Sequence, residues 1–133
     1  MKRITMLVLV LLFVLGSSCF AGTKWEYLTT NQLGEFYVDN SATQQCTVKG
    51  VEYIKIRVKV LISPSVKWVD NIGEDEYTIN TYVINKSTQD CYLQSIERYN
   101  RGDRLMDAKT YPEKWRKPGE YNIKDVVKAI LNR

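Results

Sequence analysis

Residues 51–62 constrain the fold of this 133-residue chain more than any other segment. Apolar and mostly basic residues alternate in the order Ile54, Lys55, Ile56, Arg57, Val58, Lys59, Val60, Leu61 and Ile62. A period of two predicts a β-strand with one buried and one solvent-facing side, because a helix would scatter the same residues around its circumference. Pro64 cannot donate to a strand ladder, so the strand is expected to end before it. Such a strand needs a sheet around it and a cover for its apolar side.

Other segments supply the neighbouring strands. Strand composition recurs at residues 25–30, 35–39, 77–84, 90–99 and 104–110. The turn at residues 31–34 predicts a hairpin between the first two, and residues 100–103 predict another between the last two, since Asn and Gly accept the positive φ of a tight turn. Residues 63–76 form a long connection.

The C-terminus changes to a helical period. One apolar helix face is formed by Ile123, Val126, Val127, Ile130 and Leu131. Asn122 is expected to be the N-cap, and Asp125 lies in the first turn, where the helix dipole favours negative charge. So short a helix must dock on an apolar surface to persist. We therefore predict an α+β fold, with an antiparallel sheet of about six strands and one C-terminal helix packed on it.

Residues 1–21 have the three-part pattern of a secretory signal peptide. Lys2 and Arg3 precede ten apolar residues at 6–15, and small residues follow as far as Ala21. The apolar run is shorter than the ~20 residues that span a bilayer. We expect cleavage after Ala21, one domain at residues 22–133, and export to the periplasm or cell surface. The alternative is a lipoprotein modified at Cys19, the one case in which membrane contact is expected.

Two cysteines, Cys46 and Cys91, remain after cleavage. An even count in an exported chain predicts one disulfide between them. Its loop of ~45 residues would contribute roughly 3–4 kcal/mol in the chain-entropy model. Two buried free thiols are the alternative.

The composition argues against several function classes. The chain has no histidine, which excludes histidine-based catalysis and histidine metal sites. The acidic residues Asp70, Glu74, Asp75 and Glu76 lack the spacing of a calcium loop. Without residues 1–21 the net charge is 19 − 2 − 15 = +2, so no nucleic-acid partner is expected. We expect a non-enzymatic protein without cofactor or metal.

One segment near the C-terminus interleaves cations with aromatic residues. Its members are Lys109, Tyr111, Lys114, Trp115, Arg116, Lys117 and Tyr121. Aromatic rings stack on sugars or bases while cations hold anions, so this segment is the candidate ligand site. A core role for Trp115 and Tyr121 is the alternative. The basic stripe of Lys55, Arg57 and Lys59 is a second candidate, against the simpler interpretation of a solvated strand face.

The order of short motifs along the chain resembles a known family. Trp-Glu-Tyr-Leu at 25–28 is followed by Phe-Tyr-Val-Asp-Asn-Ser at 36–41, Asp-Cys-Tyr-Leu at 90–93 and the turn at 99–102. Trp115 and the short helix close the chain. In these motifs the chain resembles the surface-adhesin protein E family of small bacterial envelope proteins.

The resemblance implies an antiparallel sheet with a C-terminal helix, and binding to host matrix and host surfaces without catalysis. Family members often carry a helix cysteine that pairs with the strand cysteine matching Cys91. This helix has none, so the pairing would have to be with Cys46.

The expected function is therefore an adhesin-like, non-catalytic binding module of the bacterial cell envelope, with a host matrix protein or glycan as ligand. The alternative is a periplasmic structural or assembly protein that binds another envelope protein through an open sheet edge. The sequence leaves a homodimer open.

Overall fold

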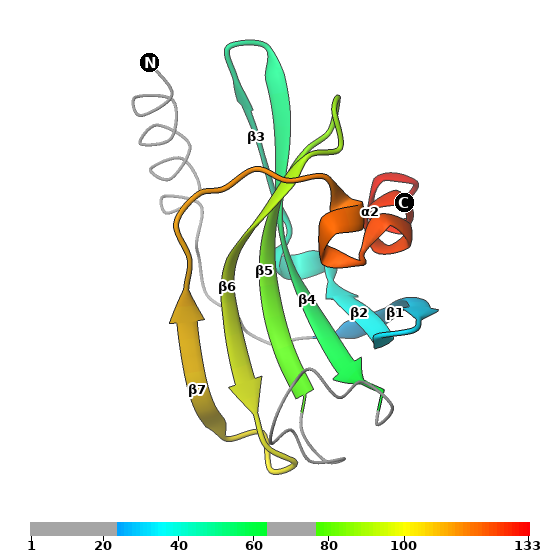
Figure 1. The fold of residues 1–133 in the computed structure, drawn as a ribbon, viewed down its shortest axis with the longest axis vertical. Helices are drawn as coiled ribbons and strands as arrows, with labels where there is room; N and C mark the ends of the chain where they lie inside the picture. The colour runs from blue at the N-terminus through cyan, green and yellow to red at the C-terminus, as the bar shows by residue number, and fades with distance from the viewer. Residues whose placement is uncertain (1–23, 64–76) are drawn as a thin grey trace.

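The computed structural model describes residues 24–63 and 77–133, which form one antiparallel sheet with a short helix against one face (Figure 1). The strands are β1 (Trp25–Asn31), β2 (Gly34–Asp39), β3 (Gln44–Val48), β4 (Val51–Ile62), β5 (Tyr77–Asn85), β6 (Cys91–Tyr99) and β7 (Leu105–Thr110). The helical segments are the 3₁₀ turns η1 (Asn40–Ala42) and η2 (Pro118–Tyr121) and the helix α2 (Lys124–Leu131). The predicted signal peptide, Cys19 and the acidic residues 70–76 lie outside the described residues.

Strand β4 organises the sheet. The strand order is β1-β2-β4-β5-β6-β7, and β3 pairs with β4 beside this path. Along one edge of β4, the N-terminal part pairs with β3 and the C-terminal part pairs with β2, while β5 pairs along its other edge. At 12 residues it is the longest strand, as the alternation in the sequence predicts.

The prediction of an antiparallel sheet with one C-terminal helix is confirmed, but the described residues contain seven strands rather than about six. The additional strand is β3, whose mixed, largely polar residues show little strand pattern. It forms because Lys49 and Gly50, with φ of 51° and 78°, make a two-residue turn that folds β3 back on β4. Positive φ at both turn positions gives the twist that a two-residue hairpin requires.

The main core lies on the side of the sheet that faces α2, which we call the helix face. It buries alternate residues of the central strands beneath the helix. Its members are Phe36, Val38, Ile54, Ile56, Val58, Val60, Tyr82, Ile84 and Cys91 from the sheet, with Ile123, Val126, Val127 and Ile130 from the C-terminal segment. The helix is docked as its apolar period predicts.

Polar contacts fix both ends of the helix to β1. The Asn31 side chain donates hydrogen bonds to the Asn122 carbonyl and to Asp125 Oδ1, each at 3.1 Å. At the other end Arg133 pairs with Glu26 at 2.8 Å. The predicted N-cap role of Asn122 is wrong: this residue has φ 57° and ends η2, and Ile123 occupies the N-cap position. The left-handed conformation, which Asn tolerates, turns the chain from η2 into α2.

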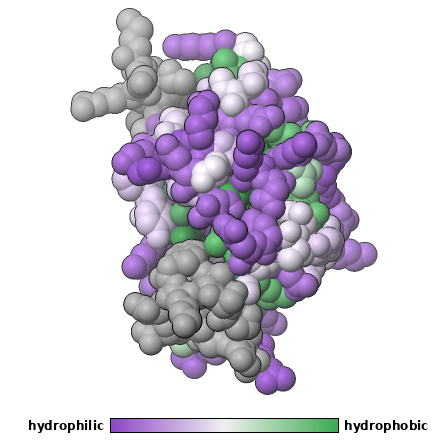
Figure 2. Space-filling model, turned by 45° about the vertical axis from the view of Figure 1, so that its right-hand side comes forward, coloured by the Kyte–Doolittle hydropathy of each residue, from purple (hydrophilic) through white to green (hydrophobic). Residues whose placement is uncertain are grey.

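The outer surface on the helix side is hydrophilic. Figure 2 turns this side towards the viewer and shows hydrophilic side chains over most of it, with hydrophobic ones in small separate patches. Lys124, Asp125 and Lys128 of α2 are exposed, whereas Val126, Val127 and Ile130 are buried. The helix therefore separates solvent from the core.

Substituting Val127 by Asp should unfold the domain. The Val127 side chain is only 1% exposed, and an aspartate there would place an unpaired charge in the core. We expect Val127→Asp to lower the free energy of unfolding by about 3–5 kcal/mol. The control is Lys124→Asp, which adds an aspartate to the exposed first turn of the same helix. Equal melting temperatures for the two variants would show that the helix is not docked.

Candidate functional site

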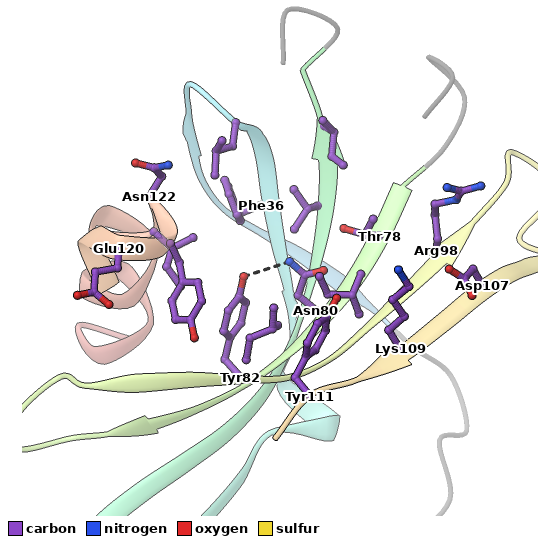
Figure 3. Close-up of a pocket in the computed structure, with 17 residues that line it drawn as sticks. Phe36, Thr78, Asn80, Tyr82, Arg98, Asp107, Lys109, Tyr111, Glu120 and Asn122 are labelled. Carbon is purple, nitrogen blue, oxygen red and sulfur yellow. Dashed lines mark hydrogen bonds between the residues drawn. The ribbon is translucent and has the colours of Figure 1, made fainter. Parts of the chain in front are cut away.

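A cavity of about 490 Å³ opens on the helix face, between strands β4–β7 and the segment that runs from η2 into α2 (Figure 3). Its lining comes from β2 and β4–β7, from that segment, and from Leu33 and Tyr111 in the connections between elements. The lining residues are Leu33, Phe36, Val60, Ile62, Thr78, Asn80, Tyr82, Leu93, Ile96, Arg98, Asp107, Lys109, Tyr111, Glu120, Tyr121, Asn122 and Ile123.

The end of the cavity nearest α2 is apolar. It is lined by the buried side chains of Phe36, Val60 and Ile123, with the partly buried Leu33 and Ile62 beside them. These residues belong to the main core or pack against it, so this end of the cavity continues the core towards the surface. An apolar group that enters the cavity here would lose its contact with water.

The end of the cavity at β7 is polar, and strand register arranges it in two rows across the sheet. In one row Asn80 of β5 lies opposite Ile96 of β6, which lies opposite Lys109 of β7. In the next row the same three strands place Thr78 opposite Arg98 and Arg98 opposite Asp107. Residues in one row of a sheet share a face, so all six side chains belong to the cavity wall.

Asn80 carries an unused acceptor inside the cavity wall. Its Nδ2 donates to the Tyr82 hydroxyl at 3.1 Å (Figure 3). Its Oδ1 is buried and accepts no hydrogen bond from the residues that the structure describes. Burial also raises the pKa of Tyr82 to about 12, so this phenol stays neutral at physiological pH. A buried acceptor without a donor costs about 1–3 kcal/mol, and the burial of Oδ1 leaves no space beside it for a ligand donor.

Charged side chains of both signs surround the mouth. Glu120 pairs with Arg116 at 3.5 Å, and Asp107 Oδ1 accepts a hydrogen bond from the backbone N–H of Ala108 at 3.0 Å. Lys109 is exposed and forms no ion pair with any residue in the described ranges. Lys109 and Asp107 therefore present charges of opposite sign at the mouth.

The structure brings together three of the seven residues of the predicted cation–aromatic segment. Lys109, Tyr111 and Tyr121 all line the cavity, and the Tyr121 ring lies 6.4 Å from that of Tyr82. Burial is the main cause that raises the pKa of Tyr121 above its usual value. These three residues keep their place as candidate ligand-binding residues.

The other four residues do not line the cavity. Trp115 packs between Tyr53 and Tyr92 on the opposite face of the sheet, with ring centroids 5.7 and 4.9 Å away. This position agrees with the alternative of a structural role. Lys117 pairs with Asp90 at 2.6 Å.

Arg116 also has a structural role, because its backbone pairs with that of Cys91 through hydrogen bonds of 2.8 and 2.9 Å. Lys114 is exposed and does not line the cavity. The segment is thus divided between the two faces of the sheet.

The basic stripe of β4 lies on the face away from the helix. Arg57 pairs with Glu97 at 3.4 Å, and the Lys59 ammonium lies 4.2 Å from the centre of the Tyr77 ring. Lys55 has a lowered pKa because it is partly buried and lies near Arg57. These contacts hold the stripe within the sheet and favour its interpretation as a structural face.

The cavity residues of β5 and β6, above all Asn80, were not predicted from the sequence. The polar pair Thr78 and Asn80 was the available signal. Both lie at alternate positions of a strand whose neighbouring residues are largely buried, where a polar side chain is unusual.

The predicted disulfide is absent from the structure, in which Cys46 and Cys91 are both free. Cys46 of β3 lies opposite Tyr53 of β4, and strand β5 separates β4 from the strand of Cys91. Three strand spacings amount to ~14 Å, whereas a disulfide needs Cα atoms within about 7 Å. The two side chains also belong to cores on opposite faces.

Within the described ranges, no three or more Cys, Asp or Glu side chains gather closely enough to hold a metal ion. Among the same residues, no helix has the length and hydropathy to span a membrane.

Comparisons of the chain with protein families, with curated proteins and with solved structures found no match.

Alkylation should distinguish the two thiols. Burial raises the pKa of Cys91 to about 11, and it also raises the pKa of the half-buried Cys46. At about pH 8 iodoacetamide should modify Cys46 slowly in the folded protein and Cys91 only after unfolding, because the thiolate is the reactive form. Peptide mass spectrometry without reductant measures the extent of alkylation at both cysteines. A peptide in which Cys46 is joined to Cys91 would contradict the structure.

Proposed function

We propose that this protein is a non-catalytic, adhesin-like binding module of the bacterial cell envelope, and that the cavity on the helix face is its ligand site. The observation that carries the proposal is the combination, in one surface cavity, of an apolar end with polar and charged side chains at β6 and β7. A pocket with mostly apolar walls and a few converging polar groups is typical of a ligand site.

The size of the cavity supports this assignment. Ligand pockets commonly measure about 300–1,000 Å³, and this one has about 490 Å³. The apolar end would hold the hydrophobic part of a ligand, and the polar end at β7 would leave the remainder at the surface.

The mouth offers groups that suit a protein or glycan ligand. Tyr111 is 40% exposed and Lys109 is exposed, and Tyr121 of η2 lines the same cavity. Aromatic rings contact sugar rings and apolar side chains, while a lysine holds an anionic group. These residues support the adhesin-like function that the family resemblance implies.

The envelope location is proposed from the sequence. The signal-peptide pattern of residues 1–21 and the family resemblance both favour export to the periplasm or cell surface.

The alternative of an assembly protein finds support at the edge of the sheet. Strand β7 ends the strand order, all six of its residues are exposed, and Leu105 and Met106 are about half exposed. Another envelope protein, or a second copy of this chain, could add a strand here. Strand β7 also has features that protect an edge strand from pairing, namely Asp107, Lys109 and the bulge near Leu105. These features make the cavity the stronger candidate for the binding site.

Blocking the cavity should remove its ligand affinity. In Ile96→Trp the larger side chain projects into the cavity, so we expect the protein to lose at least about tenfold in affinity for the neutral apolar dye N-phenyl-1-naphthylamine, because the ring occupies space that the dye needs. Fluorescence titration of the exported protein measures this change.

The matched control is Ser95→Trp, which places the same ring on the opposite face of the same strand. It should bind the dye as the parent protein does. Equal dye affinity for the parent and a folded Ile96→Trp variant would show that the cavity is not the binding site. Binding of matrix proteins and glycans to the same variants tests the adhesin function.

Protease treatment of intact cells tests the location. We expect the domain to be cleaved on intact cells, because an adhesin must reach its ligand outside the outer membrane. Permeabilised cells are the control for protease sensitivity. Protection until the outer membrane is permeabilised would confine the protein to the periplasm and favour the assembly role.

A further inference from the structure

We propose that two copies of this chain associate through their β7 strands, which pair antiparallel about Ala108 and continue one sheet across both copies. Strand β7 forms an edge of the sheet (Figure 1), and all six of its residues are exposed. Three features of this edge favour a second copy as its partner: its apolar side chains, the direction of its backbone groups and the order of its charges. The pairing does not depend on what the cavity binds.

Exposed apolar side chains gather at this edge. Among the residues that the structure describes, the large hydrophobic side chains that are exposed are those of Tyr27, Leu105, Met106 and Tyr111. All except Tyr27 belong to β7 or to the residue that follows it. A strand that pairs with β7 would cover part of this apolar surface and release water from it.

The backbone groups of Ala108 point outwards from the edge. The Tyr111 N–H donates to the Gln94 carbonyl of β6 at 2.9 Å. Because the hydrogen bonds of an antiparallel pair alternate along a strand, Lys109 and Asp107 also bond to β6, whereas Ala108 between them directs its N–H and C=O away from it. The Ala108 N–H agrees with this, since its acceptor is the Asp107 carboxylate and not β6. A second strand must therefore pair with Ala108.

The charges of β7 favour one register for this pairing. When Ala108 lies opposite Ala108 of the second copy, Asp107 of each copy lies opposite Lys109 of the other. These are the non-hydrogen-bonded pairs, in which the Cα atoms are about 4.5 Å apart and the side chains are closest. A slide by two residues in either direction would place two aspartates or two lysines opposite each other. A slide by one residue would break the alternation of the hydrogen bonds.

Asp107 and Lys109 are available for these contacts. Both are exposed, and neither forms an ion pair with any residue in the described ranges. Against an unrelated strand the two charges protect the edge, because they would face side chains that do not complement them. Against a second copy they form two ion pairs, one on each side of Ala108. The edge is therefore selective for its own copy.

The pairing would also bring the two cavities together. The two-fold axis of an antiparallel strand pair is perpendicular to the sheet, so the helix faces of both copies lie on the same side. Asp107 and Lys109 both line the cavity. Lys109 of the second copy would therefore lie beside Asp107 at the mouth of the first copy's cavity. Because a contact over six residues is small, we expect a weak dimer that dissociates on dilution.

Cysteine cross-linking tests the register. In Ala108→Cys the Cα atoms of the two introduced cysteines would be about 5.5 Å apart, within the range of a disulfide. The control is Thr110→Cys, on the same face of β7, for which the two Cα atoms would be about 14 Å apart along the strands. After mild oxidation of the exported protein, we expect Ala108→Cys to give at least about five times more cross-linked dimer on non-reducing electrophoresis. The parent protein, with Cys46 and Cys91, gives the background.

Charge reversal tests the ion pairs. Sedimentation velocity over a range of concentrations gives the dissociation constant of the dimer. We expect Asp107→Lys alone and Lys109→Asp alone each to raise this constant at least about tenfold, because like charges then face each other at two positions. An equal mixture of the two variants should form a heterodimer, since every facing pair then has opposite signs. The double variant Asp107→Lys/Lys109→Asp should dimerise as the parent protein does.

Lys114→Asp is the matched control, since this exposed lysine lies outside β7 and its reversal changes the net charge as Lys109→Asp does. It should leave the dissociation constant unchanged. Equal cross-linking of the two cysteine variants, or an unchanged dissociation constant in both single charge variants, would overturn the proposal. A parent protein that stays monomeric at about 1 mM would overturn it too, and would leave the edge to another envelope protein. The dye titration of Ile96→Trp tests the cavity independently of these results.

Discussion

The structure depends on a difference in size between an apolar sheet face and the short helix that covers only part of it. The alternating residues of β4 require a cover over their apolar side, and neighbouring strands extend this face towards β6. The helix α2 has only eight residues, a length of about 12 Å. It is fixed to β1 by Asn31 and by Arg133, so it covers the β1–β4 side of the sheet. The cavity opens beside the helix on the same face, and its lining continues from β2 and β4 to β5–β7.

The elements with regular periods could be predicted from the sequence. Strand β4 has one of the clearest strand patterns, and the apolar spacing of residues 123–131 indicates the face by which the helix docks. Strand β3 could not be recognised from composition, because its pairing depends on the positive φ of Lys49 and Gly50. Lysine is an uncommon residue at such a position, so the hairpin has a weaker sequence signal than Asn-Gly would give.

The candidate site was predicted only in part because the cation–aromatic segment changes faces along its length. Lys109 and Tyr111 line the cavity. Trp115 lies on the opposite face of the sheet and packs on Tyr53 and Tyr92. The chain then returns through η2, which places Tyr121 back in the cavity wall. Residues that are neighbours in sequence separate whenever a connection passes over a sheet edge. The disulfide prediction fails for a related reason, since cysteine parity carries no information about strand order.

Asn80 is a polar residue at a position where the surrounding sheet face is apolar. On the helix face, the neighbours of Asn80 across the sheet are the apolar residues Val58 of β4 and Ile96 of β6. A leucine at the position of Asn80 would remove a buried oxygen that accepts no hydrogen bond from the described residues. Polar groups that a core would dispense with are typical of sites where stability is exchanged for specificity. The hydrogen bond from its Nδ2 to Tyr82 leaves the amide oxygen buried and without a donor among the described residues.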